Sequence, residues 1–140
     1  GAVRATCMMA SPIPAEIASR WIRDGTAERI LEANRRELDL RRACALEILG
    51  AWHLDCPPGC QFAWLHLPEP WRAVDFAAAA KRRGVVVAPA EAFAVGRGEV
   101  AHGVRIGLGP PRERGRLEQA LQRLADLLRD GPDESFGAIV

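Results

Sequence analysis

The sequence predicts an α+β fold, in which a small, mostly antiparallel sheet is covered by helices. Apolar residues recur at helical spacing in long segments near both ends of the chain and once in its middle. Short runs of β-forming residues lie between these segments, and glycine or proline separates most of them. The resulting order is helix, helix, two strands, helix, two strands, helix, which is typical of helices packed on one sheet.

The composition is that of a globular chain of about one domain. Its 140 residues are 49% hydrophobic, which is enough for a core. Basic and acidic residues nearly balance at a net charge of +1, so we expect no direct contact with nucleic acid or an anionic membrane. No apolar run reaches the length of a membrane span, and the N-terminus lacks the pattern of a secretory signal. We therefore expect a cytoplasmic chain whose cysteines are reduced.

Two helices are expected at the start of the chain. The first begins after Ser11 and ends at Gly25, and its apolar residues recur at helical spacing: Ile13, Ile17 and Trp21. The second is long and runs from Thr26, a residue type that caps helices, to the stop at Gly50. Arginine and glutamate interleave along it, which indicates a solvated face rather than a binding surface.

The middle of the chain predicts the first strands. Ala51–Leu54 and Phe62–Leu67 are short β-prone runs on either side of a turn rich in proline and glycine, so they form a hairpin or two adjacent strands. A third helix follows from Trp71 to a stop at Gly84. Its basic last turn holds Lys81, the only lysine, where the helix dipole favours a cation and a structural role is expected.

Two more strands and a helix complete the predicted fold. The unbroken apolar run Val85–Pro89 indicates a buried strand, and Ala90–Gly103 is a glycine-punctuated loop. The next strand carries Arg105. The last helix is strongly amphipathic and ends near Gly131; its leucines are Leu117, Leu121, Leu124 and Leu128.

Arg105 is the strongest candidate for a functional residue. Its neighbours Val104, Ile106 and Leu108 are β-formers, so a charged side chain among them must point at water, at a carboxylate, or into a pocket that holds an anion. The rigid fork of a guanidinium suits the third use, because it can bind both oxygens of a carboxylate. From spacing alone, a strand arginine that points at solvent is the alternative.

Other chemistry is poorly supported by the sequence. Cys56 and Cys60 lie near His53 and His66, but the cysteines lack the C-x2-C spacing of zinc sites and no second pair follows, so we predict no metal site. His102 is the only histidine near the suspected pocket, and no nucleophile with a base and an orienting partner can be assembled. The glycine pairs lack the features of a phosphate loop. We therefore predict no catalytic residue in this chain.

The order of four segments resembles the C-terminal small domain of fold-type I aminotransferases. These are A-S-P-I-P-A-E-I-A-S-R-W-I-R-D-G-T-A, F-A-W-L-H-L-P-E-P-W, R-R-G-V-V-V-A-P-A-E-A-F-A-V-G, and H-G-V-R-I-G-L-G before a leucine-rich helix. The chain resembles more narrowly that part of the MocR-type regulators, in which a winged-helix DNA reader of the GntR class is fused to an aminotransferase-like domain. The resemblance places the small domain at residues 11–131, after a remnant of a preceding segment at 1–10 and before a tail at 132–140.

The resemblance gives Arg105 a role. In the family, the matching strand arginine holds the α-carboxylate of an amino-acid substrate or effector. The loop matching Ala88–Gly96, which contains Pro89 and Phe93, closes over the same site. This implies an amino-acid-like small molecule as the ligand.

The resemblance also implies partners that lie outside this chain. The family's Schiff-base lysine, the aspartate that pairs the pyridine nitrogen and the phosphate-binding residues belong to the large domain, so pyridoxal phosphate (PLP) is expected in the parent protein and no cofactor in this chain alone. We expect a homodimeric parent. With a winged-helix DNA reader upstream the parent would be a regulator, and the alternatives are a true aminotransferase and a stand-alone interaction module. Without the large domain we expect an apolar face that includes Trp21 and Trp71.

Overall fold

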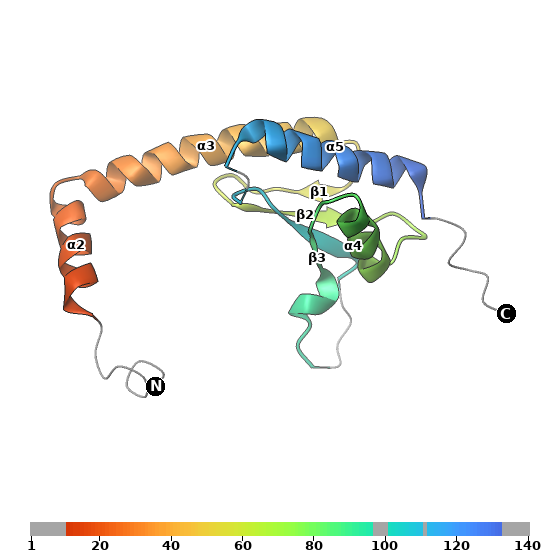
Figure 1. The fold of residues 1–140 in the computed structure, drawn as a ribbon, viewed down its shortest axis with the longest axis horizontal. Coiled ribbons are helices and arrows are strands. Elements are labelled where there is room, and N and C mark those ends of the chain that lie inside the picture. The colour runs from red at the N-terminus through yellow and green to blue at the C-terminus, as the bar shows by residue number, and fades with distance from the viewer. Residues whose placement is uncertain (1–10, 97–100, 111, 133–140) are drawn as a thin grey trace. The chain divides into compact units, whose positions relative to one another are not determined.

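The computed structural model describes residues 11–96, 101–110 and 112–132 of the chain (Figure 1). The chain divides into two compact units, Gly1–Glu37 and Leu38–Val140, and each is described by itself. The predicted elements are present in the predicted order, with most ends shifted by a few residues. The expected remnant at 1–10, and all of the expected tail at 132–140 except residue 132, lie outside the described residues.

The first unit contains α2 (Pro12–Arg23) and the beginning of α3 (Thr26–Leu49). Pro12 occupies the first helical position, where its missing N–H costs nothing, and Gly25 has a φ of 75°, which favours glycine after a helix. Thr26 is not the cap that the sequence predicts. Asp24 Oδ1 instead accepts a hydrogen bond of 2.9 Å from the Thr26 backbone N–H. Hydrogen bonding from Thr26 lowers the pKa of Asp24, so the carboxylate is held in its charged form at the start of α3.

The apolar residues of α2 lie at its surface. None of its residues is buried, and Trp21 is 47% exposed. The expectation that Trp21 belongs to an exposed apolar face is therefore confirmed.

The second unit is built on a four-stranded antiparallel sheet with the strand order β1-β2-β4-β3. The strands are β1 (Leu54–Asp55), β2 (Phe62–His66), β3 (Ala88–Pro89) and β4 (Gly103–Gly107). This confirms the predicted α+β class with a small antiparallel sheet. Because β4 pairs with both β2 and β3, the strand that carries Arg105 is internal to the sheet.

One face of the sheet forms the core with three helices. Successive side chains of a strand point to opposite faces, and Leu65 of β2 and Val104 of β4 are fully buried. They pack with the C-terminal part of α3, α4 (Ala73–Arg82) and α5 (Arg114–Asp130). In Figure 1, α5 and the end of α3 lie together on one side of the strands. On the opposite face, the residues of β2 and β4 are half-buried apart from Gly103, which is buried, and they include Arg105.

The segment before β3 differs from its prediction. The sequence indicates one buried strand over residues 85–89, but only Ala88 and Pro89 pair with β4. The Val85 N–H donates to the Ala80 carbonyl at the end of α4, so the run begins as an extension of the helix end. Val86 is 81% exposed. The unbroken apolar run therefore does not form a strand that is buried on both faces of the sheet.

The structure places Trp71 in the core rather than at the surface. It was predicted to lie on the exposed apolar face, but only 4% of its surface is exposed. Its indole contacts the ring of Phe76 edge-on, with 5.2 Å between the ring centroids. Trp71 is therefore part of the core of this unit, and the exposed-face prediction for it is wrong.

A buried arginine fixes the connection between β4 and α5. The Arg41 guanidinium, which α3 carries into the core, donates to the carbonyls of Leu108 and Gly109 at 2.8 and 3.2 Å. A third hydrogen bond of 3.4 Å reaches the carbonyl of Arg112. Backbone carbonyls that leave a sheet need partners when they are buried. Arg41 supplies them, and so it holds the end of the strand that contains Arg105.

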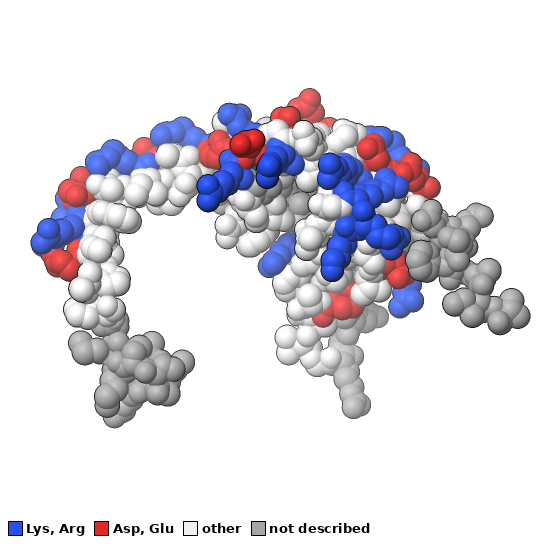
Figure 2. Space-filling view, viewed as in Figure 1, with Lys and Arg blue, Asp and Glu red and all other residues white. Residues whose placement is uncertain are grey.

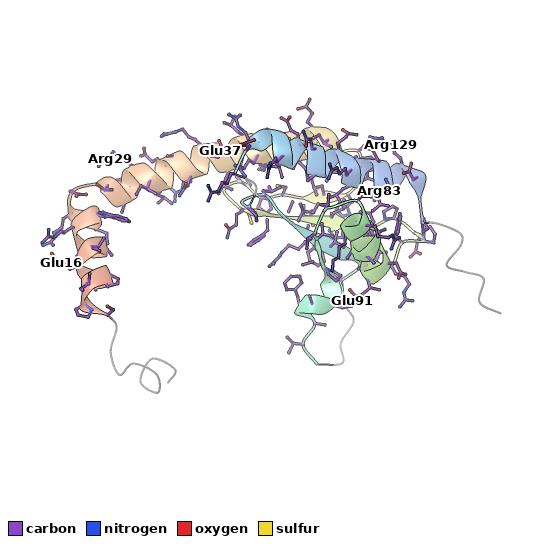
Figure 3. All side chains as sticks on the ribbon, in the orientation of Figure 1. Glu16, Arg29, Glu37, Arg83, Glu91 and Arg129 are labelled. Carbon is purple, nitrogen blue, oxygen red and sulfur yellow. The ribbon has the colours of Figure 1, made fainter. Side chains whose placement is uncertain are left out.

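The outer surface of the helices is mixed in charge. Arg83 at the end of α4, which is labelled in Figure 3, donates to Asp130 of α5 at 2.7 Å. Figure 2 shows acidic and basic side chains mixed over α5. Within the described ranges, no helix combines the length and the apolar character needed to cross a bilayer.

Candidate functional site

Arg105 lies in the middle of β4 on the face of the sheet that is opposite the core. Its two neighbours in sequence, Val104 and Ile106, point into the core, so the alternation of the strand sends Arg105 outward. Its cross-strand partners are Trp64 on β2 and Ala88 on β3. The arginine therefore lies between two strands rather than at an edge, and its side chain is half-buried.

Two aromatic rings contact the guanidinium of Arg105. Its Cζ lies 4.3 Å from the ring centroid of Phe62 and 4.5 Å from that of Phe93. Phe62 is on β2, and Phe93 ends η1 (Ala90–Phe93), a single 3-10 turn after β3. Both distances are within the range of cation–π attraction, which contributes about 0.5–1 kcal/mol at exposed sites. The rings hold the guanidinium in one place while its N–H groups remain at the edge of the plane.

The N–H groups of Arg105 lack a hydrogen-bonding partner in the described part of the chain. Among the described residues, no hydrogen bond or ion pair to this guanidinium is present, and its contacts are the two rings. A guanidinium that is positioned by aromatic faces can offer two parallel N–H groups to a planar anion. The two oxygens of a carboxylate match these two N–H groups. An arginine that only points at solvent would not need aromatic rings to position it.

A tryptophan extends this aromatic surface. The Trp64 ring meets Phe93 edge-on at a centroid distance of 6.5 Å. A Cβ added at Gly103 would lie only 2.6 Å from Trp64 Nε1 and 2.6 Å from the Leu65 carbonyl oxygen. Gly103 therefore has to lack a side chain, because the indole and the neighbouring backbone lie against it. We call Phe62, Trp64 and Phe93 the aromatic platform.

Part of the Ala88–Gly96 loop lies beside Arg105, as predicted. Phe93 contacts the guanidinium, and in Figure 3 its turn η1, marked by Glu91, lies on the side of the sheet opposite α5. Pro89 pairs with Val104 in the sheet, and its extended backbone (φ −69°, ψ 155°) leads directly into η1. Pro89 thus positions the turn, and Phe93 provides the contact.

Two residues of the platform were not singled out from the sequence. Phe62 and Trp64 are two positions apart in a strand, so the period of a strand places them on one face. That signal was present in the sequence. It does not reveal which strand lies opposite, and only the register of β2 with β4 brings these rings to Arg105.

The remaining residues considered from the sequence lie elsewhere. Lys81 is exposed in the basic last turn of α4, as predicted. His102 is exposed, and its backbone carbonyl accepts a hydrogen bond from the Leu67 N–H at 3.5 Å. Cys56 is buried, burial raises the pKa of its thiol, and Cys60 is half-buried. His53 and His66 come together with Asp55 rather than with these cysteines.

The residues that this chain contributes do not by themselves fit a pyridoxal phosphate site. A covalently held pyridoxal group needs a lysine amine that is desolvated or placed near a second cation within a pocket. Lys81 is exposed at a helix end and offers no such setting. What the chain offers is an arginine whose guanidinium lies over two rings of the aromatic platform.

Comparison with known proteins identifies the fold. No protein-family model matches the chain, and no curated protein sequence matches it. Among solved structures, it is similar to a kynurenine aminotransferase of Pyrococcus horikoshii (TM-score 0.79, 23% identity, 92% of this chain and 33% of that one). It is also similar to a multiple substrate aminotransferase of Thermococcus profundus (0.79, 21%, 92% and 33%) and to an archaeal alanine:glyoxylate aminotransferase (0.75, 24%, 91% and 32%).

These likenesses show an aminotransferase-like fold. The chain spans about one third of the length of the structures that it matches. It therefore has the fold of one part of such proteins.

Proposed function

We propose that this chain is the small-domain part of a PLP-dependent, aminotransferase-like protein, and that Arg105 binds the carboxylate of its amino-acid ligand. One observation carries the proposal: the Arg105 guanidinium lies over two aromatic rings and has no anionic partner among the described residues. The fold likeness and the resemblance of H-G-V-R-I-G-L-G to the family segment support the same role.

The expected interaction is a pair of parallel N–H···O hydrogen bonds to the two carboxylate oxygens. Hydrogen bonds to charged groups contribute about 1.5–3 kcal/mol, or about one to two decades of affinity. The aromatic platform increases this contribution, because a guanidinium that is already held loses less freedom on binding. Phe93 lies on a short turn beside the site, and it would cover a ligand bound to Arg105.

The cofactor would be held by other parts of the parent protein. PLP supplies an electron sink for chemistry at the carbon that carries the amino group. The Pyrococcus structure is described as a complex with PMP, and a Thermus thermophilus α-aminoadipate aminotransferase (TM-score 0.76, 19% identity) as a complex with N-(5'-phosphopyridoxyl)-L-leucine. In this division of roles, Arg105 fixes the carboxylate end of the ligand, and its own chemistry is binding alone.

Two kinds of parent are compatible with this site. The sequence resemblance favours a MocR-type transcription regulator, a homodimer in which an amino-acid effector changes how a fused winged-helix DNA reader sits. The likeness to solved structures favours a true aminotransferase, because the similar proteins are themselves described as aminotransferases. In both, the large domain is the partner and an amino-acid-like molecule is the ligand.

The carboxylate role is tested in the intact parent protein by the substitution Arg105→Lys. This change keeps the positive charge but loses the fork, so the amino-acid affinity should fall about 10- to 100-fold while cofactor binding is retained. The measurement is a titration of cofactor absorbance with amino acids. Arg116→Lys on the exposed surface of α5 is the matched control and should titrate like the wild type. An unchanged affinity in Arg105→Lys would leave Arg105 as an ordinary strand arginine.

The kind of parent is tested separately. A regulator should bind a specific DNA site with strong salt dependence and should change that affinity when an amino acid is added. An enzyme should transfer the amino group to a 2-oxo acid over many turnovers. Single-turnover transfer without DNA binding would support neither a regulator nor an efficient enzyme.

A further inference from the structure

A second cluster of functional side chains lies on the same face of the sheet as Arg105. His53 directly precedes β1, Asp55 ends β1 and His66 ends β2. The His66 N–H donates to the His53 carbonyl at 2.9 Å, so the two histidines face each other across the strands. Asp55 is two residues from His53, which places it on the same face. Paired backbone, rather than a free loop, therefore sets the positions of all three side chains.

The ligand-type atoms of these residues converge. His66 Nε2 lies 2.7 Å from Asp55 Oδ2, and His53 Nε2 lies 3.7 Å from Asp55 Oδ1. The two imidazole rings are stacked, with centroids 4.0 Å apart and planes inclined by 14°. One nitrogen or oxygen atom from each residue lies within 4.8 Å of the other two. Both rings thus direct a nitrogen toward the same carboxylate.

This spacing is close to that required by a tetrahedral metal ion. Zinc binds histidine nitrogen and carboxylate oxygen at about 2.0–2.2 Å, so two of its ligand atoms are about 3.4 Å apart. The two distances from Asp55, 2.7 and 3.7 Å, bracket that value. Small side-chain rotations would place all three atoms around one ion. Because all three residues are partly exposed, an ion could enter directly from solvent.

We propose that His53, Asp55 and His66 form a zinc site with three protein ligands and one open coordination position. Two imidazoles and one carboxylate suit Zn²⁺, whereas Mg²⁺ and Ca²⁺ require sets of oxygen ligands. Zinc binding replaces the hydrogen bond between Asp55 and His66 with two metal–ligand bonds, and the neutral His66 imidazole binds through Nε2 in the tautomer that carries its proton on Nδ1. The site is separate from the carboxylate site at Arg105, and Trp64 lies between the two on β2, with its ring 6.5 Å from that of His66.

The nearby cysteines are poorer ligands. Cys56 is buried, and a backbone carbonyl rather than its thiol accepts the hydrogen bond from Arg42 Nε. Zinc binds thiolate, and burial disfavours that form of Cys56. Cys60 does not belong to the converging group. The proposed metal site therefore contains no cysteine ligand.

The test is calorimetric titration of the full chain, with thiols reduced, using Zn²⁺ alone. We expect one Zn²⁺ per chain and no binding of Mg²⁺ at the same concentration. Loss of an outer-shell partner costs about 10- to 100-fold in metal affinity, and loss of a direct ligand should cost at least as much. His53→Gln, Asp55→Asn and His66→Gln should each show that loss.

The controls are the remaining histidine and two of the cysteines. His102→Gln and the double variant Cys7→Ser/Cys60→Ser should bind zinc as the wild type does. The Co²⁺-loaded chain should show ligand-field bands without a thiolate charge-transfer band. Wild-type affinity in His53→Gln, or loss of binding in the cysteine variant, would overturn the proposal. His53 is the most exposed of the three, so His53→Gln keeps the test valid even if a strand variant fails to fold.

Discussion

Gly103→Ala is the substitution whose cost the structure defines most sharply. The added Cβ would lie 2.6 Å from the Leu65 carbonyl oxygen and 2.6 Å from Trp64 Nε1. The carbonyl belongs to a strand that pairs with β4 over five residues, so it cannot move without disturbing that pairing. The indole can turn, but it would then leave the aromatic platform.

The magnitude follows from overpacking of a closed position. Extra methyl groups in such places cost about 1–3 kcal/mol. For a chain of this size, 1 kcal/mol lowers the melting temperature by about 4 °C, so the expected decrease is about 4–12 °C. The assay is thermal unfolding followed by circular dichroism, and in urea unfolding the midpoint should likewise fall while the slope is unchanged.

A matched control lies in α5. Nothing is within 4 Å of a Cβ added at Gly115, and alanine is favoured over glycine in helices by about 0.5–1 kcal/mol, so Gly115→Ala should be neutral or stabilising. If Gly103→Ala were as stable as Gly115→Ala, the close packing of Trp64 against β4 would be refuted, and the platform with it.

Two further predictions concern the core. Arg41→Met keeps the apolar stem but leaves buried carbonyls of the β4–α5 connection without donors, so the free energy of unfolding should fall by about 1–3 kcal/mol; a stability equal to that of the wild type in urea unfolding would contradict this role. Burial raises the pKa of Cys56, so its thiolate fraction should begin to rise only at a higher pH than that of an ordinary thiol. Alkylation followed by peptide mass mapping should therefore modify Cys60 well before Cys56 at neutral pH, and equal rates would contradict this.

Much of the fold could be predicted from local patterns. Helical spacing located α2, α3 and α5 to within a few residues, since apolar periodicity over long segments is a strong signal. The prediction of one buried strand over residues 85–89 was wrong in part, because a short apolar stretch does not show which of its residues pair with a neighbouring strand. The prediction that Trp71 is exposed was wrong because the sequence does not show how α4 packs. Phe76 of α4 is one of the residues that contact Trp71.

The site could be predicted only one residue at a time. A lone arginine among β-formers indicated Arg105, and the family resemblance placed the loop with Phe93 beside it. The contact with Phe62 depends on the register between two strands that are about forty positions apart, which no local pattern encodes. The same is true of His66, which joins His53 and Asp55 across a turn whose length alone does not fix the pairing.

The central claim is that the Arg105 guanidinium binds the carboxylate of the amino-acid ligand. The most direct test removes the carboxylate from the ligand and the guanidinium from the protein, first separately and then together. In the intact parent protein, an amino acid and its carboxamide are titrated against cofactor absorbance, with the wild type and with Arg105→Lys. We predict that the wild type binds the amino acid about 10- to 100-fold more tightly than its carboxamide and that this preference is lost in Arg105→Lys, because the carboxylate and the guanidinium interact directly. A preference of the same size in both proteins would show that another residue binds the carboxylate, and it would contradict the role proposed for Arg105.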